Sequence, residues 1–269
     1  MPLFVSLCIS AKEIRNTMIA LTHVISPDID RCELSFLERS PINYKRAVEQ
    51  HEQYCELLRD CGIEVIELSM NRSFPDSTFI EDTAVVLDEL AIMASMGVES
   101  RREEIPGIES VLGYYKDMQH IRLPATLEGG DVLRIEKKFF VGISPRTNIA
   151  GFESIKGILE PFGYEVIPVA VNGCLHLKSA CVAVDDRTLL VNPCWLDLQP
   201  LSDFRIIPVP EDEPAAVNSL RINSTICMHS GYKKTIDSLV KLGFSVKTVD
   251  ISELLKAEAG MTCSSIIFS

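Results

Sequence analysis

The chain has 269 residues, with 26 basic and 38 acidic side chains and a formal net charge of −12. Hydrophobic residues make up 46% and charged residues 24%, a composition that supports a sizeable core and excludes a disordered tail or a fibrous protein. The acidic balance, with no local Lys/Arg cluster, argues against binding to nucleic acid or to an anionic membrane, whereas small cationic substrates remain compatible.

The nine cysteines favour a reducing cytoplasmic location. Their number is odd and they form no CxxC pair, so neither a disulfide framework nor a zinc ribbon is predicted. Residues 1–18 are interpreted as an N-terminal extension, because the apolar segment 2–10 is too short to span a bilayer and has no basic stretch before it. With no linker composition elsewhere, residues 19–269 are predicted to form a single domain.

The predicted elements repeat in one order along the chain, which indicates an internal repeat of about five units. Each unit has a hairpin, an amphipathic helix that ends near a glycine, and a short apolar strand. In chain order they are strand 19–25, helix and strand 44–66, hairpin 83–93, a degenerate helix and strand 108–123, hairpin 131–142, helix and strand 152–167, hairpin 181–191, a segment 202–208 that has lost most of its helix, hairpin 219–228, and helix and strand 233–247.

The last strand, residues 265–268, has no neighbouring partner in the sequence. We expect it to pair with residues 19–25 and to close a ring. A continuous doubly wound sheet is the alternative interpretation of the same alternation of strands and helices. No Gly-x-Gly-x-x-Gly motif follows a strand, so a Rossmann nucleotide site is disfavoured.

Cys263 and His176 are candidates for covalent catalysis. Cys263 follows Gly260, which allows a tight turn before the final strand, and His176 stands between two leucines. A cysteine among apolar residues is more often a small buried hydrophobe, and an isolated histidine is more often structural. The two residues lie far apart in the sequence, so the fold must bring them together if they act as a pair.

Acidic residues form two groups that precede predicted strands. Glu128 and Asp131 flank two glycines, and Asp76, Glu81 and Asp82 surround the apolar pair at positions 79–80. Charges so close to core strands indicate a bound cation or an ion pair, with a solvated turn as the alternative for the first group. Arg101 and Arg146 could hold a substrate carboxylate, although such charges usually form a solvated surface.

Taken together, these motifs closely resemble the dimethylarginine dimethylaminohydrolase family. This family belongs to the guanidine-modifying superfamily, which also contains arginine deiminases and amidinotransferases. The similarity runs from about residue 19 to residue 268, and several specific segments match in order. The resemblance implies the pentein fold, a closed α/β propeller with five blades built from pseudo-fivefold ββαβ units, in agreement with the repeat found above.

The resemblance implies roles for individual residues. The catalytic residues would be Cys263 as nucleophile, His176 as general acid and base, and Glu128, which with Asp82 grips the guanidinium. The residues that hold the amino acid end of the substrate would be Asp76, Glu81, Arg101, Arg146 and the backbone of Leu34. The chain departs from the family in residues 1–18 and at Gly129, where some members have alanine.

The implied activity is hydrolysis of Nω-methylated arginine to citrulline and an alkylamine, with no metal or cofactor and with a small cationic guanidino substrate. The resemblance also allows a homodimer. An ordinary thiol is mostly protonated at neutral pH, and neighbouring carboxylates suppress its ionisation further. We therefore expect substrate-assisted catalysis, in which the arriving guanidinium neutralises these carboxylates and Cys263 then attacks as a thiolate.

Three alternatives remain open at this point. Arginine deiminases and arginine dihydrolases share the motifs, although deiminases usually carry an inserted helical domain for which 269 residues leave no room. A catalytically silent pentein that binds arginine-like ligands is opposed by the intact Cys263, His176 and Glu128. A cysteine hydrolase of esters or amides needs an oxyanion hole, which a pocket rich in carboxylates would oppose.

Overall fold

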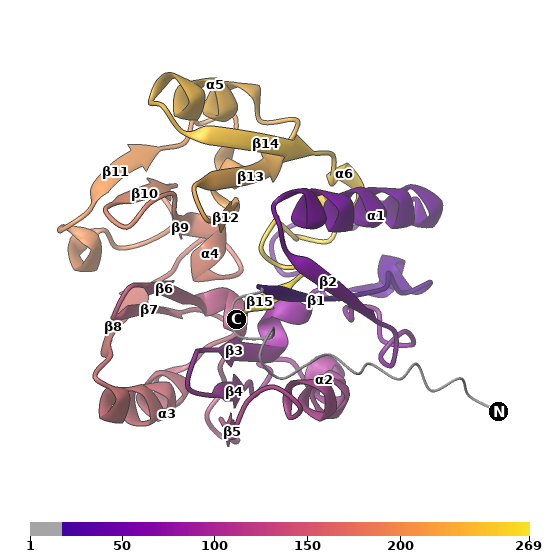
Figure 1. The fold of residues 1–269 in the computed structure, drawn as a ribbon, viewed down its shortest axis with the longest axis vertical. Helices are drawn as coiled ribbons and strands as arrows, with labels where there is room; N and C mark the ends of the chain where they lie inside the picture. The colour runs from indigo at the N-terminus through magenta and orange to yellow at the C-terminus, as the bar shows by residue number, and fades with distance from the viewer. Residues whose placement is uncertain (1–17) are drawn as a thin grey trace.

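The computed structural model describes residues 18–269, so nearly all of the predicted N-terminal extension lies outside the described part. Within residues 18–269, fifteen strands form five three-stranded sheets (Figure 1). Each sheet combines one antiparallel pair with one parallel pair. In this part of the chain, no helix is long and apolar enough to cross a membrane.

The sheets follow the order of the predicted repeats. Their strands are β15 (Ile266–Phe268), β1 (Ile19–His23) and β2 (Glu64–Leu68); β3 (Ala84–Val86), β4 (Ala91–Met93) and β5 (Met118–His120); β6 (Val132–Ile135), β7 (Lys138–Ile143) and β8 (Glu165–Ala170); β9 (Cys181–Ala183), β10 (Thr188–Val191) and β11 (Arg205–Pro208); and β12 (Leu220–Ile222), β13 (Thr225–His229) and β14 (Ser245–Val249).

The two ends of the described part of the chain share one sheet. Strand β15 pairs antiparallel with β1, with Ile19 opposite Phe268, and β1 pairs parallel with β2. The predicted non-local pairing is therefore confirmed. As a consequence, the segment just before β15, which contains Cys263, is held close to β1.

Helices connect the second and third strands of four sheets and lie at the periphery of the molecule in Figure 1. They are α1 (Tyr44–Asp60), α2 (Ile105–Leu112), α3 (Ile149–Leu159) and α5 (Lys233–Lys241). The fourth sheet has only the 3-10 turn Gln199–Leu201 at this place, so the prediction of a lost helix is confirmed. Two single-turn helices, α4 (Leu177–Ala180) and α6 (Ser252–Leu255), are too short to leave a periodic pattern in the sequence.

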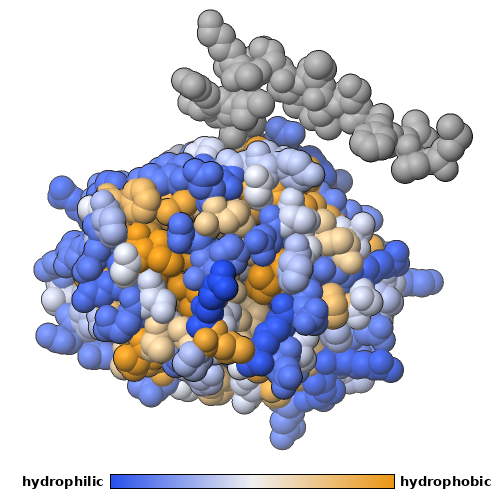
Figure 2. All heavy atoms as spheres, turned by 90° about the horizontal axis from the view of Figure 1, so that it is seen from below, coloured by the Kyte–Doolittle hydropathy of each residue, from blue (hydrophilic) through white to orange (hydrophobic). Residues whose placement is uncertain are grey.

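Helix α1 shows how local sequence produces these elements. Asn43 caps its first turn by accepting a hydrogen bond from the backbone N–H of Arg46 at 3.2 Å. Ala47, Tyr54 and Leu58 recur at helical spacing and are buried in the core. Such burial is the main source of stability for a helix of this kind. On the outer surface, Figure 2 shows apolar residues in separate groups between hydrophilic ones.

Candidate active site

Four predicted site residues, together with Asn218, which the sequence did not reveal, occupy corresponding places in the five repeats. Asp82, Glu128, His176, Asn218 and Cys263 each stand within a few residues of the start of β3, β6, β9, β12 and β15, respectively. These five strands lie closest to the common centre of the sheets in Figure 1. Residues that are distant in sequence thus meet at one end of the innermost strands.

A small cavity of about 20 Å³ lies at this meeting point. Six of the predicted site residues line it, namely Asp76, Asp82, Arg101, Arg146, His176 and Cys263. Glu128 lies behind His176 and is completely buried. A volume of this size holds about one water molecule, so an arginine-sized ligand requires movement of the residues that close the cavity.

His176 and Glu128 form a buried pair. Nε2 of His176 lies 2.7 Å from Oε2 of Glu128, and Nδ1 lies 3.8 Å from Oδ1 of Asp82. Burial alone would lower the pKa of His176, but the nearby carboxylates, Asp82 first, raise it to about 9. Burial alone would raise the pKa of Glu128, but the hydrogen bond and charge of His176 lower it to about 2. At neutral pH the pair is therefore an imidazolium beside a carboxylate, which suits a general acid.

Gly130 permits this arrangement through the space that it leaves free. A Cβ atom at this position would lie 2.7 Å from Nδ1 of His176 and 2.8 Å from Oδ1 of Asp82. The backbone N–H of Gly130 also donates to Oδ1 of Asp82 at 3.2 Å. The glycine thus allows the histidine and the carboxylate to approach each other, and its role is close packing rather than flexibility.

Two arginines of the chain contact the carboxylates of the site. Nη1 of Arg101 donates to Oδ2 of Asp82 at 2.7 Å, and Nη1 of Arg146 lies 3.5 Å from Oε1 of Glu128. Arg101 also pairs with Glu104 at 3.0 Å. The carboxylates are thus already arranged to receive guanidinium groups.

Metal binding is the alternative use of these carboxylates. Asp82, Glu128 and His176 each offer a ligand atom, and these atoms lie within 4.8 Å of one another. A metal ion would have to sit beside the guanidinium groups of Arg101 and Arg146 and would be repelled by them. The charge distribution favours an organic cation that replaces an arginine as the partner of a carboxylate.

Cys263 is half-buried, and its sulfur faces two N–H donors. The backbone N–H of Gly260 donates to Sγ at 3.3 Å, and Nδ2 of Asn218 lies at 3.8 Å. Burial, with the charges of Glu81 and Asp82, raises the pKa of the thiol to about 12. In the free protein Cys263 is therefore a thiol at neutral pH. A cation that neutralises the acids would let the two donors stabilise a thiolate.

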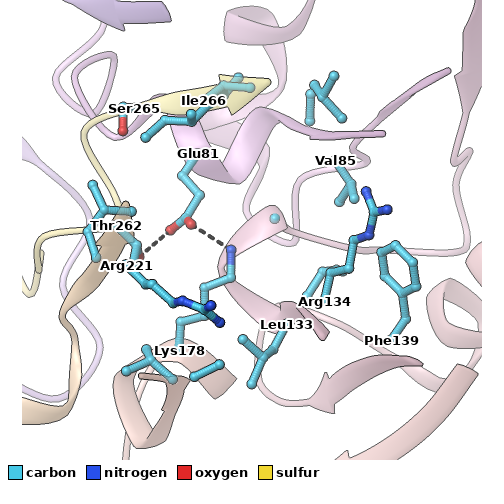
Figure 3. Close-up of a pocket in the computed structure, with 18 of the residues that line it drawn as sticks. Glu81, Val85, Leu133, Arg134, Phe139, Lys178, Arg221, Thr262, Ser265 and Ile266 are labelled. Carbon is cyan, nitrogen blue, oxygen red and sulfur yellow. Dashed lines mark hydrogen bonds and ion pairs between the residues drawn. The ribbon is translucent and has the colours of Figure 1, made fainter. Parts of the chain in front are cut away.

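Two predicted substrate-binding residues lie away from the small cavity. The carboxylate of Glu81 accepts hydrogen bonds from Nζ of Lys178 at 2.5 Å and from Oγ1 of Thr262 at 2.6 Å (Figure 3). It faces a second, larger cavity. Leu34 packs against the same core cluster as Cys263, and it does not line the small cavity. The preceding residue, Glu33, donates its backbone N–H to Oδ1 of Asp76 at 3.1 Å.

Glu258 is a site residue that the sequence did not reveal. It lines the cavity, and its carboxylate accepts backbone N–H groups from Ser35 at 3.0 Å and from Phe36 and Leu37, each at 2.5 Å. Its backbone has a φ of 58°, in the left-handed region. A glutamate that follows a single-turn helix carries no sequence motif, so only the fold shows that it holds residues 35–37 beside the cavity.

Comparisons with known proteins agree with this geometry. The family model for "N,N dimethylarginine dimethylhydrolase, eukaryotic" matches residues 26–193. The N(G),N(G)-dimethylarginine dimethylaminohydrolase of Streptomyces coelicolor is 36% identical over 92% of this chain and 95% of that protein. The protein of the same name from Pseudomonas aeruginosa is 34% identical, over 84% of this chain and 90% of that protein.

Solved structures show the same similarity. A mutant of the P. aeruginosa enzyme in complex with citrulline has a TM-score of 0.87 and 30% identity, covering 93% of this chain and 98% of that one. The N-terminal domain of ArgZ, an arginine dihydrolase, has a TM-score of 0.85 at 20% identity, over 94% of this chain and 98% of that one, and so shows the shared α/β fold of small sheets. On this evidence the chain belongs to the dimethylarginine dimethylaminohydrolase family.

Proposed function

We propose that the protein hydrolyses Nω-methylated arginine to citrulline and an alkylamine through a covalent intermediate on Cys263. The observation that carries this proposal is the convergence of Cys263, the protonated His176 and the guanidinium-binding Asp82 on one cavity. The citrulline complex of a related enzyme from P. aeruginosa supports the choice of product.

Binding comes first in the mechanism. The substrate guanidinium takes the place of a chain arginine beside Asp82 and Glu128, which fixes its plane and its positive charge. Arg101 and Arg146 are then free to turn towards the substrate carboxylate. Asp76 receives the substrate ammonium group, and the backbone of Leu34 completes the binding residues at this cavity.

Charge neutralisation by the substrate then makes the thiol reactive. The Cys263 proton leaves to solvent, and the thiolate attacks the guanidinium carbon to give a tetrahedral adduct. His176 donates its proton to the departing dimethylamine, which breaks the C–N bond and leaves a thiouronium on the sulfur. Neutral His176 next removes a proton from water, and the resulting hydroxide attacks the same carbon. The new hydroxyl group loses its proton to solvent as the C–S bond breaks, which gives citrulline and restores the thiolate.

We also propose that the five sheets are the five blades of a pentein propeller. The repeated order of an antiparallel pair followed by a parallel pair supports this interpretation. In such a fold the residues before each innermost strand share one end of the axis, which accounts for the site without any inserted domain.

Product analysis by mass spectrometry tests the function. We expect the wild-type protein to convert asymmetric dimethylarginine to citrulline and dimethylamine, and a Cys263→Ser variant to form neither. Citrulline or ornithine from arginine instead would contradict the substrate assignment and would indicate a deiminase or a dihydrolase. Absence of turnover with both substrates, together with saturable binding of either, would indicate the catalytically silent alternative.

Alkylation of Cys263 tests the substrate-assisted step. Without ligand, the rate should increase with pH throughout the neutral range, because the pKa of the thiol is raised to about 12. A small guanidinium compound that fills the site without reacting should increase the rate at neutral pH. A rate that is independent of pH in the absence of ligand would refute the substrate-assisted step.

A further inference from the structure

A second cavity of about 320 Å³ lies on the other side of the catalytic segments. Residues of β3, β6, β9, β12 and β15, the innermost strand of each sheet, all contribute to its wall. The two cavities share no lining residue, but residues that are adjacent in the sequence line different cavities. Glu81 and Thr262 face the large cavity, whereas Asp82 and Cys263 face the small one.

The large cavity is basic in a protein of net charge −12. Among the described residues that line it, Lys178, Arg134 and Arg221 are basic and Glu81 is acidic (Figure 3). The rest of the wall is mainly apolar and includes Val85, Leu133, Phe139 and Ile266, with a few small polar side chains. A cavity with these properties suits an anion that has a short apolar body.

The basic groups lie at two depths. The Lys178 side chain is 16% exposed and pairs with Glu81, whereas Arg134 and Arg221 are 35% and 32% exposed. Arg134 pairs with Asp88 at 3.4 Å, and Arg221 pairs with Asp186 at 2.7 Å.

These pairing partners, Asp88 and Asp186, are themselves 67% and 59% exposed. Exposed ion pairs of this kind contribute little, so either arginine can exchange its partner for a bound anion at small cost.

We propose that this cavity binds a short aliphatic dicarboxylate. One carboxylate would reach Lys178 and Arg221, which lie on the same side of the cavity in Figure 3, the other would pair with Arg134 beside Phe139, and the methylene groups would contact the apolar wall. Phosphate has the charge but lacks the apolar body, and it cannot reach both sides of the cavity at once.

Binding there would affect the catalytic cysteine through Lys178. This step rests on the proposed function, whereas the binding site itself does not. Lys178 lowers the pKa of Cys263 and Glu81 raises it. An anion that draws the ammonium group away from Glu81 leaves the negative charge of Glu81 less neutralised, so the thiolate forms less readily. We therefore expect the dicarboxylate to inhibit turnover without competing with the substrate.

Isothermal titration calorimetry with glutarate, at constant ionic strength set by sodium chloride, tests the site. We expect one saturable binding site in the wild-type protein and at least tenfold weaker binding in Arg221→Gln and in Lys178→Met. Arg205→Gln is the matched control, because Arg205 is an exposed arginine of β11 outside the cavity, and it should bind like the wild type. Thermal unfolding of each variant checks that it is folded.

The proposal is wrong if the wild-type protein shows no saturable heat with glutarate, or if folded Arg221→Gln and Lys178→Met bind as tightly as the wild type. Equal affinity for phosphate would overturn the assignment to a dicarboxylate. Because calorimetry needs no turnover, these outcomes are independent of whether the protein hydrolyses methylarginine.

Discussion

Removal of the Glu258 carboxylate should release residues 35–37 from their closed position beside the cavity. Glu258→Ala deletes the acceptor of three backbone hydrogen bonds, from Ser35, Phe36 and Leu37. At about 1 kcal/mol each these bonds would contribute about 3 kcal/mol, and water can replace part of this at a partly exposed site. A net loss of about 2 kcal/mol corresponds to an open state that is populated about 30-fold more.

Hydrogen exchange of the Phe36 and Leu37 amides, measured by NMR, follows this opening directly. We expect about 30-fold faster exchange in Glu258→Ala, a higher KM, and partial recovery in Glu258→Gln, which keeps one accepting oxygen. The control is Glu136→Ala, because Glu136 is an exposed glutamate that also has a positive φ of 51°. Unchanged exchange in Glu258→Ala, or an equal change in the control, would refute the reasoning.

Three further predictions concern the site itself. Glu128→Gln removes the carboxylate that holds a proton on His176. NMR titration should therefore show a lower pKa for this histidine, and kcat should fall about 100-fold or more. An unshifted pKa of His176 would contradict the role of Glu128 in keeping the histidine protonated. Gly130→Ala places a Cβ 2.7 Å from His176, so activity should be lost while circular dichroism remains native; full activity would disprove the close-packing role. Burial raises the pKa of Asp76 to about 6. KM should therefore increase as the pH falls through about 6, because a protonated Asp76 no longer attracts the substrate ammonium group. The Asp76→Asn variant should lose this pH dependence of KM.

Local pattern was sufficient to predict most of the fold. The hairpins, the helices that end near glycine and the shortened fourth repeat all depend on residues close together in the sequence. The pairing of β15 with β1 was predictable for a different reason, because an apolar terminal strand without a local partner must find one elsewhere.

The contacts made by single side chains were not predictable in the same way. Glu258 and the N–H groups of Ser35 and Phe36 are separated by more than 200 residues, and no periodicity links them. Glu81 and Asp82 are neighbours in one 3-10 turn, yet their carboxylates face different cavities. The resemblance implies a substrate-binding role for both, and only the backbone geometry of the turn separates their surroundings.

The position of Cys263 depends on contacts with several repeats at once. Its carbonyl oxygen accepts the backbone N–H of Glu81 at 3.1 Å, and the hydroxyl of Tyr54 donates to the carbonyl of Met261 at 3.0 Å. Oδ1 of Asn218 accepts the backbone N–H of Thr262 at 3.0 Å. The nucleophile is thus held by a helix of the first repeat and by the loops that precede β3 and β12. Because no single sheet positions the thiol, the site forms only when the pairing of β15 with β1 brings the end of the chain back to its beginning.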